Sequence, residues 1–467
     1  MSEPTRPSKR PRPVHARPRR QASLKPTGRT VALDALAEHA KRFPRLAISP
    51  VSTGGLDPRS AAFARAMHDA AVRRWMTSVW IAEQFAAQPW RRTQPMLQAA
   101  LIGGVTQLAF LGGVADHAAL FETVDWTKAR AKPKLGGVVN AILRKVIAAL
   151  GEPEDGPWNE RRDALPLSDG RVLPLRGIRL PDDRRKAVSI ATSCPTPLLD
   201  RWAEAFEPDE AARLALHGIV EAPVWLNTEQ AGGPIEPAEW VKAIEPHAAL
   251  WEGPPGELGA WLTARGDVWA QDPSAAEPVR LIADRRPARV LDLCAGRGTK
   301  TRQLLHALPE AQITATDTDD ARRRDLRAVF AGVDRSRVIE PAELAKAGPF
   351  DLILLDVPCS NTGVLPRRVE ARYRLGPGDV SRMVGLQREI LTSAAGLLAP
   401  GGAVLYATCS LEREENEAQA LWSAQQLGLR LLHDARRSPA GVPGDGPEAY
   451  RDGSYAAVLE RPSDRVE

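Results

Sequence analysis

Apolar runs alternate with helical segments through the last part of the chain, from Pro287 onward. The runs read ARVLDLC, QITATD, FDLILLD and GGAVLYATC, and the helical segments TKTRQLLHAL and ARRRDLRAVF separate the first three. Strands that are apolar throughout are buried on both faces, and strands joined through helices run parallel. The pattern therefore predicts an α/β domain with a doubly wound, mostly parallel sheet.

A glycine-containing loop follows the first predicted strand, and Asp317 closes the second one. Glycines let the backbone approach a ligand closely, and an acid about 20 positions downstream can accept both ribose hydroxyls of a nucleoside cofactor. The residues expected to contact such a cofactor are Cys294, Ala295, Gly296, Arg297, Gly298, Thr299, Lys300 and Asp317. The same pattern also fits a nicotinamide or flavin cofactor, so it does not identify the ligand by itself.

Two later strands end in cysteine motifs. FDLILLD is followed by a Val-Pro-Cys-Ser stretch that contains Cys359, and GGAVLYA is followed by a Thr-Cys-Ser stretch that contains Cys409. Ligands in open α/β sheets bind outside the carboxyl ends of the strands. We therefore expect Asp356, Cys359 and Cys409 in the same crevice as the glycine-containing loop. A buried cysteine is ordinarily a small apolar residue, and this is our interpretation of Cys194.

These motifs together resemble the RsmB/Sun branch of the RNA cytosine-5 methyltransferases. The branch has Asp-Leu-Cys-Ala-Ala-Pro-Gly-Gly-Lys-Thr, Asp-x-Pro-Cys-Ser-Gly-Thr-Gly, and Ser/Thr-Cys-Ser followed by Glu-Asn-Glu. The chain has DLCAGRGTKT, DVPCSNTGVLPRR and ATCSLEREENE at these places, and the resemblance covers about residues 60–460. The departures from the pattern are Gly296, Arg297, Thr299 and Asn361.

The resemblance implies an enzyme that uses S-adenosylmethionine to methylate carbon 5 of a cytosine in RNA. Cys409 would attack carbon 6 of the base, and Cys359 would assist release of the product. Asp356 would bind the base and also contact the cofactor, and Glu340, near the third strand, would contact its adenine side. DNA cytosine-5 enzymes use the cysteine of the Pro-Cys motif as the nucleophile, so the second cysteine favours RNA.

Small-subunit ribosomal RNA is the substrate that the resemblance favours. Arginines close behind the Pro-Cys motif are candidate phosphate contacts, namely Arg367, Arg368, Arg372 and Arg374. A solvated charged face is the alternative for this group. Two other functions stay open: a transfer-RNA cytosine-5 methyltransferase, and a non-catalytic RNA-binding ribosome assembly factor of the same fold. The presence of Cys409, Cys359, Asp356 and Lys300 argues against the assembly factor.

The chain is expected to divide into five segments. These are a disordered basic arm (1–35), an all-α NusB-like RNA-binding domain (36–150), a linker (151–178), a small α+β domain (179–270) and a Rossmann-like methyltransferase domain (271–467). Basic residues and prolines alternate in the arm, which predicts phosphate binding, although a solvated tail or a transit peptide would look similar. The segment from Gln107 to Val146 carries the NusB-like resemblance, and a helical bundle without RNA contact is its alternative.

The four cysteines include no Cys-x-x-Cys pair, which argues against a disulfide framework or a structural zinc site. We therefore expect no metal and a cytoplasmic location. The most apolar stretch, from Leu97 to Leu120, is interrupted by polar residues and paired glycines, so no membrane span is expected. The expected oligomeric state is a monomer.

Overall fold

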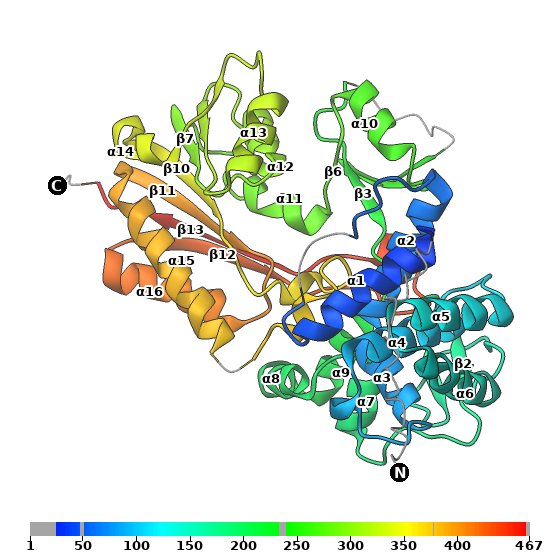
Figure 1. The fold of residues 1–467 in the computed structure, drawn as a ribbon. Helices are drawn as coiled ribbons and strands as arrows, with labels where there is room; N and C mark the ends of the chain where they lie inside the picture. Colours follow the sequence, from blue (N-terminus) through cyan, green and yellow to red (C-terminus); the bar gives the residue numbers. More distant parts are fainter. Residues whose placement is uncertain (1–24, 47–50, 233–239, 377, 464–467) are drawn as a thin grey trace, which may run out of the picture.

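The computed structural model describes residues 25–46, 51–232, 240–376 and 378–463. They form a helical region, a small antiparallel sheet and a large, mostly parallel sheet (Figure 1). Among the described residues, no helix combines the length and the apolar character needed to span a membrane.

The helical region starts with helices that pack around one apolar core. They are α1 (Gly28–Arg42), α2 (Pro58–Arg73), α3 (Trp75–Glu83), α4 (Pro95–Phe110), α5 (Asp116–Arg130) and α6 (Pro133–Ala149). A proline begins α2, α4 and α6, where its missing N–H has no intrahelical partner to lose. This region confirms the predicted all-α NusB-like part of the fold.

Helix α1 begins at Gly28, which lies inside the segment 1–35 that was expected to be a disordered arm. The start is fixed by a capping box, in which two threonine side chains satisfy free N–H groups of the first turn. Leu33 and Leu36 of α1 are fully buried, so this stretch has the apolar face that a disordered segment lacks. Residues 1–24 of the arm lie outside the described residues.

A hairpin and further helices complete the helical region. They are β1 (Ala164–Pro166), β2 (Val172–Pro174), α7 (Arg184–Thr192), α8 (Thr196–Phe206) and α9 (Pro208–His217). The hairpin lies in segment 151–178, which was expected to be a linker, but Leu165 and Leu173 are buried in the core of the N-terminal helices. Helices α7 to α9 share that core. The helical region therefore extends to about His217, into segment 179–270 that was expected to form the small domain.

The small sheet has the strand order β4-β5-β3-β6, with all pairs antiparallel. Its elements are β3 (Val224–Asn227), β4 (Val241–Glu245), β5 (Ala248–Trp251), α10 (Leu258–Arg265) and β6 (Trp269–Ala270). Trp251 contacts the rings of Trp240 and Trp261, so α10 and the sheet are joined by aromatic packing.

The large sheet has the order β12-β13-β11-β10-β7-β8-β9. Its strands are β7 (Arg289–Asp292), β8 (Gln312–Ala315), β9 (Ser336–Val338), β10 (Phe350–Asp356), β11 (Leu398–Thr408), β12 (Arg430–Arg437) and β13 (Ser454–Glu460). Strands β7 to β11 pair in parallel, whereas β13 is antiparallel to both its neighbours. The predicted doubly wound, mostly parallel sheet is confirmed.

Helices cover both faces of the large sheet. They are α11 (Pro273–Arg280), α12 (Thr299–Ala307), α13 (Asp320–Val329), α14 (Leu344–Ala347), α15 (Asp379–Gly396) and α16 (Glu417–Leu427). In β10, Leu352 and Leu354 join the core with α11 to α13, and Ile353 and Leu355 join the core with α14 to α16. Successive residues point to opposite faces, which explains why this strand is apolar throughout.

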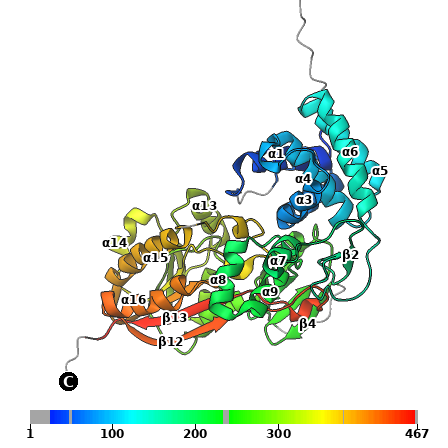
Figure 2. The same ribbon diagram turned by 90° about the horizontal axis from the view of Figure 1, so that it is seen from below.

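Segments that follow two strands of the large sheet share a hydrophobic core with the helical region. Helices α7 to α9 lie between the N-terminal helices and the pair α15 and α16 (Figure 1, Figure 2). Leu365, Val369 and Tyr373, from the segment after β10, pack into the core of the helical region. The Tyr373 hydroxyl also donates a hydrogen bond to the carbonyl oxygen of Val72, at 2.8 Å.

Arg372 lies inside this junction and is 1% exposed. Its guanidinium donates to the carbonyl oxygens of Thr192, at 3.1 Å, and Gly218, at 2.5 Å. The prediction that Arg372 contacts RNA is wrong, because the side chain is buried and its donors are used by the protein. A neighbouring buried arginine, Arg74, donates in the same way to carbonyl oxygens of the helical region.

Candidate functional site

The carboxyl ends of β11, β10, β7 and β8 form one edge of the large sheet. The register pairs Asp356 with Ala407, Leu354 with Asp292, and Asp292 with Ala315, so these strands end at nearly the same level. The glycine-containing loop, the carboxylates and both cysteines therefore come to the same edge. This is the position where ligands bind in open α/β sheets.

The loop from Cys294 to Gly298 is fixed by backbone hydrogen bonds. The Ala295 N–H donates to the carbonyl oxygen of Thr316, at 3.0 Å, and the Gly296 N–H donates to Asp317 Oδ2, also at 3.0 Å. Asp317 is 5% exposed, and its other oxygen accepts the Asp319 N–H at 2.9 Å. The loop and the acid after the second strand are thus directly connected.

The two glycines of this loop have different reasons to be glycine. At Gly298, which has φ of +84°, a Cβ atom would lie 2.6 Å from the Phe330 ring, so packing excludes any side chain. At Gly296, which has φ of +58°, a Cβ atom would meet nothing within 4 Å, so this position faces open space. Arg297 and Thr299, which depart from the family pattern, are both exposed.

Asp292, the last residue of β7, lies at this edge and is not among the residues predicted to contact a cofactor. It is 1% exposed, and Oδ2 accepts a hydrogen bond from Thr301 Oγ1 at 2.6 Å. None of the described residues donates to Oδ1. Burial raises the pKa of Asp292 to about 7, against the Thr301 hydrogen bond, and the nearby charge of Asp356 adds to the rise. In the sequence, the feature that could have identified Asp292 is its position just before the glycine-containing loop.

The two cysteines of the strand-end motifs are in contact. Cys359 Sγ and Cys409 Sγ lie 3.3 Å apart. Beside them, Lys300 Nζ donates to Asp356 Oδ2 at 2.8 Å. The structure therefore brings the three residues predicted for the chemistry together with Lys300 of the predicted cofactor loop.

The ionisation of two of these groups is shifted by their neighbours. The hydrogen bond with Cys409 and then burial raise the pKa of Cys359 well above its ordinary value. Burial disfavours the charged form of Lys300, but the charge and hydrogen bond of Asp356 outweigh it and raise the pKa of the amine. Cys359 is thus protonated at neutral pH, and Lys300 carries its positive charge beside the thiols.

Asn361, another departure from the family pattern, contacts both cysteines. Its backbone has φ of +60°, where asparagine is the best tolerated substitute for glycine. The side-chain amide donates to the carbonyl oxygen of Cys359 at 2.8 Å, and its oxygen accepts from Cys409 Sγ at 3.4 Å. This substitution is therefore compatible with the turn and adds polar contacts to it.

The loops after β10 and β11 are held together by the carboxylate of Glu415, which is fully buried. It accepts hydrogen bonds from the Ser360 N–H at 3.0 Å, the Ser410 hydroxyl at 2.6 Å and the Gln387 amide at 3.0 Å. Ser360 and Ser410 directly follow the two cysteines in the sequence. One buried carboxylate thus fixes the residues next to both thiols.

Some residues that were predicted to contact RNA or the cofactor form ion pairs within the protein instead. Arg367 is paired with Asp272 and Asp452, at 3.2 and 2.7 Å. Glu340 is paired with two arginines of α13. Arg368 and Arg374 are exposed. Of the four arginines predicted to bind RNA, these last two are exposed, and their side chains form no hydrogen bond or ion pair within the described part of the chain.

The sheet order, the glycine-containing loop and the paired thiols define a Rossmann-like methyltransferase joined to a NusB-like helical domain. The family model described as 16S rRNA methyltransferase RsmB/F matches residues 279–429, and the NusB family model matches residues 27–148. The chain belongs to the RsmB/F family of S-adenosylmethionine-dependent RNA methyltransferases. The resemblance predicted from the motifs is confirmed.

The similarity to relatives extends over most of the chain. Ribosomal RNA small subunit methyltransferase B of Xanthomonas campestris pv. campestris is 30% identical over 440 residues, which are 88% of this chain and 91% of that protein. The protein of the same name from Vibrio cholerae is 26% identical, over 88% of this chain and 92% of its own. The crystal structure of PH0851 covers 94% of this chain and 99% of its own, with a TM-score of 0.67 and 20% identity, which shows the fold alone.

The sheet edge suits the cofactor of this family. S-adenosylmethionine carries a sulfonium and an ammonium group, and the carboxyl groups of Asp292, Asp317 and Asp356 surround the loop at the strand ends. The open space at Gly296 leaves room for a ligand against the backbone. The unpartnered oxygen of Asp292 is a buried acceptor of the kind that a bound cation satisfies.

Asp292 gives a prediction for stability against pH. The folded protein keeps the Asp292 proton up to about pH 7, whereas the unfolded chain loses it near pH 3.8. The stability that this proton contributes is therefore complete below about pH 4 and is lost as the pH rises towards 7. Relative to Asp292→Asn, the free energy of unfolding should therefore fall between pH 4 and 7, by on the order of 1 kcal/mol per pH unit at most. Urea titrations at several pH values measure it. Asp284→Asn, at an exposed position, is the control, and parallel pH curves for the wild type and Asp292→Asn would contradict the prediction.

Proposed function

We propose that this chain methylates carbon 5 of a cytosine in small-subunit ribosomal RNA through a covalent adduct on Cys409. The observation that carries the proposal is the pair of thiols 3.3 Å apart, at the ends of neighbouring strands and beside Lys300 and Asp356. Two adjacent thiols suit a reaction that must both form and break a bond to sulfur. The substrate follows the relatives named ribosomal RNA small subunit methyltransferase B.

The chemistry requires activation of a poor nucleophile. The thiolate of Cys409 adds to carbon 6, the carbon 5–carbon 6 double bond breaks, and carbon 5 gains the electron pair that forms a bond to the methyl group. S-adenosylmethionine, when bound, would supply that methyl group from its sulfonium, with the sulfur–methyl bond breaking and S-adenosylhomocysteine as the leaving group. Loss of the proton from carbon 5 then restores the double bond and expels the Cys409 thiolate.

Asp356 and Lys300 are proposed to act on the base. The Asp356 side chain is 40% exposed, so a base in the crevice can reach it, and its carboxylate can accept a hydrogen bond from the amino group of cytosine and from N3 where N3 carries a proton. Lys300 keeps Asp356 oriented through the 2.8 Å hydrogen bond and adds positive charge near the ring as the adduct forms. Cys359, which is protonated at neutral pH, is placed next to the sulfur that must leave.

The RNA must present an unstacked cytosine to this edge. Removing a base from its stack costs about a few kcal/mol and least where the base is already unpaired. Arg368 and Arg374 are exposed behind the Pro-Cys motif and are proposed to bind phosphates. For the cofactor, the proposed contacts are the loop from Cys294 to Lys300 with Asp292 and Asp317, while Glu340 stays a proposal for the adenine side.

Methyl transfer to defined RNAs tests the proposed function. Purified protein is incubated with methyl-labelled S-adenosylmethionine and, in separate reactions, small-subunit ribosomal RNA, assembled small subunits and transfer RNA. Digestion to nucleosides should yield labelled 5-methylcytidine from ribosomal RNA. Label in transfer RNA alone would favour the transfer-RNA enzyme, and binding of RNA without any transfer would favour the assembly factor.

A substitution of Asp317 tests the cofactor site. Asp317→Ala removes a buried carboxylate that is expected to bind the ribose hydroxyls, and a hydrogen bond to a charged group contributes about 1.5–3 kcal/mol. We expect the Kd for S-adenosylmethionine to rise about 10- to 100-fold. Isothermal titration calorimetry measures it, with Asp320→Ala, at the start of α13, as the control. Equal affinities of the two variants would contradict the assignment.

A further inference from the structure

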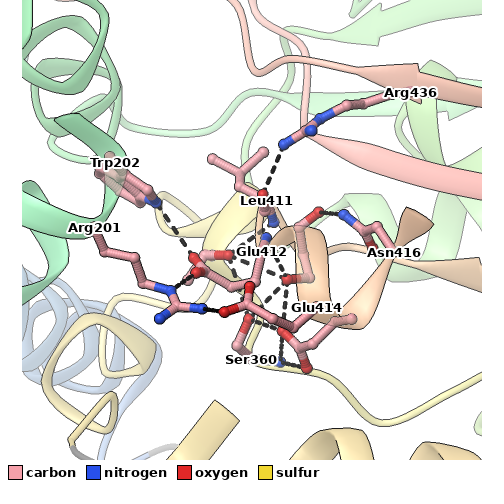
Figure 3. Close-up of polar contacts among 11 residues, drawn as sticks. Arg201, Trp202, Ser360, Leu411, Glu412, Glu414, Asn416 and Arg436 are labelled. Atoms are coloured by element: carbon pink, nitrogen blue, oxygen red, sulfur yellow. Dashed lines mark hydrogen bonds and ion pairs between the residues drawn. The ribbon is translucent and has the colours of Figure 1, made fainter. Parts of the chain in front are cut away.

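The loop that carries Cys409 is contacted by a helix of a different region. This loop, residues 409–416, follows β11 of the large sheet, and the contact comes from Arg201 and Trp202 of α8 in the helical region (Figure 3). Nothing in the sequence pattern of the catalytic motifs points to these two residues.

Arg201 binds two carboxylates of the loop. Its Nε donates to Glu412 and its terminal nitrogen donates to Glu414, as Figure 3 shows. The indole N–H of Trp202 donates to the other oxygen of Glu412, at 3.4 Å. A planar guanidinium with several fixed donors is suited to bind two acceptors at once, whereas a lysine amine acts as a single charge.

Glu412 depends on this contact because it is buried. The residue is 3% exposed, and Arg201 is its ion-pair partner in the described part of the chain. Burial raises the pKa of Glu412, whereas Arg201 acts in the opposite direction. Removing one partner of a buried ion pair leaves the other charge without compensation, and the group must then protonate or move towards water.

The contact continues from Glu412 to the residues next to both thiols. The Glu412 N–H donates to the Ser410 hydroxyl at 2.9 Å, and that hydroxyl donates to Glu415 at 2.6 Å. Glu415 also accepts the N–H of Ser360. Displacement of Glu412 would therefore move Ser410, which is adjacent to Cys409, and would disturb the carboxylate that fixes the neighbour of Cys359.

We propose that Arg201 is a positioning residue for Cys409, which acts through Glu412 and Ser410 without touching the reacting atoms. The proposal rests on the proposed role of Cys409 as the nucleophile. It makes α8 of the helical region a functional part of the methyltransferase site. A structural role alone, in which Arg201 only joins two parts of the protein, predicts loss of stability with unchanged turnover of the folded molecules.

Variants of the full-length protein separate these two roles. Arg201→Ala should lower kcat about 10- to 100-fold, the size of effect that a small misplacement of a reacting group produces. The KM for S-adenosylmethionine should stay within about twofold, because the cofactor loop is not touched. Arg201→Lys should recover part of the rate, since it restores the charge but not the paired contact. Arg185→Ala is the matched control, because it breaks an exposed ion pair between α7 and α8, Arg185 with Asp200, in which Arg185 bonds to Asp200 and not to the loop.

A second readout does not depend on RNA. The rate at which iodoacetamide alkylates Cys409, followed by mass spectrometry of its peptide, should change in Arg201→Ala and stay at the wild-type value in Arg185→Ala. Arg201→Ala with wild-type kcat and alkylation rate, after correction for the folded fraction, would overturn the positioning role. Methyl transfer by a Cys409→Ala variant would instead overturn the proposed function itself, so the two failures are distinguishable.

Discussion

Replacing Cys409 with alanine is expected to abolish methyl transfer to RNA. Without the thiol, carbon 6 receives no nucleophile and carbon 5 stays unreactive, so the rate should fall on the order of 10⁴-fold or more, as when other covalent nucleophiles are removed. Binding of S-adenosylmethionine should be unchanged, because the cofactor loop follows a different strand. Transfer of labelled methyl groups and calorimetry measure the two quantities.

The control for this experiment is a thiol elsewhere in the molecule. Cys194 is buried in the core of the helical region, and burial raises its pKa to about 12. Cys194→Ala should therefore keep methyl transfer, after allowance for a small loss of stability. Continued methylation by Cys409→Ala at a rate near that of the wild type would show that the nucleophile is assigned wrongly.

Replacing Cys359 with alanine is expected to trap RNA covalently on the protein. The adduct on Cys409 can still form, but the protonated thiol 3.3 Å from its sulfur is missing when the bond to carbon 6 must break. Turnover should fall strongly while a complex that resists denaturation accumulates. Denaturing gel electrophoresis detects it as a band of protein with reduced mobility.

A double variant and a reaction without S-adenosylmethionine define the origin of that band. It should be absent from the double variant Cys359→Ala with Cys409→Ala, since neither thiol of the pair is then present to form the bond. It should also be absent without S-adenosylmethionine if adduct formation and methyl transfer are coupled. Normal turnover by Cys359→Ala with no adduct would exclude a role of this thiol in product release.

Features that depend on local pattern were predicted well. The strands of the large sheet are buried on both faces, so their sequences are apolar throughout and separable from the helices between them. Since parallel strands end at one edge, the meeting of Lys300, Asp356, Cys359 and Cys409 also followed from the sequence. The resemblance to known motifs then supplied the order of the chemical steps.

Features that depend on distant partners were not predicted. Arg372 looks like a surface arginine in the sequence, and only the fold shows that its partners are carbonyl oxygens of Thr192 and Gly218. Arg201 is far from the catalytic motifs in the sequence, and only the fold shows that it donates to Glu412. The hairpin in segment 151–178 was missed because strands of three residues carry almost no periodic signal.

The core that the helical region shares with the segments after β10 and β11 limits movement between the helical region and the large sheet. Moving the two apart would expose apolar residues and would leave buried Arg372 without its carbonyl partners, so a hinge at this junction is costly. The spacing between the NusB-like surface and Cys409 is then set by the fold. An RNA that contacted both would need contact points at that fixed separation, so the distance between them in the folded RNA would limit which RNAs are substrates.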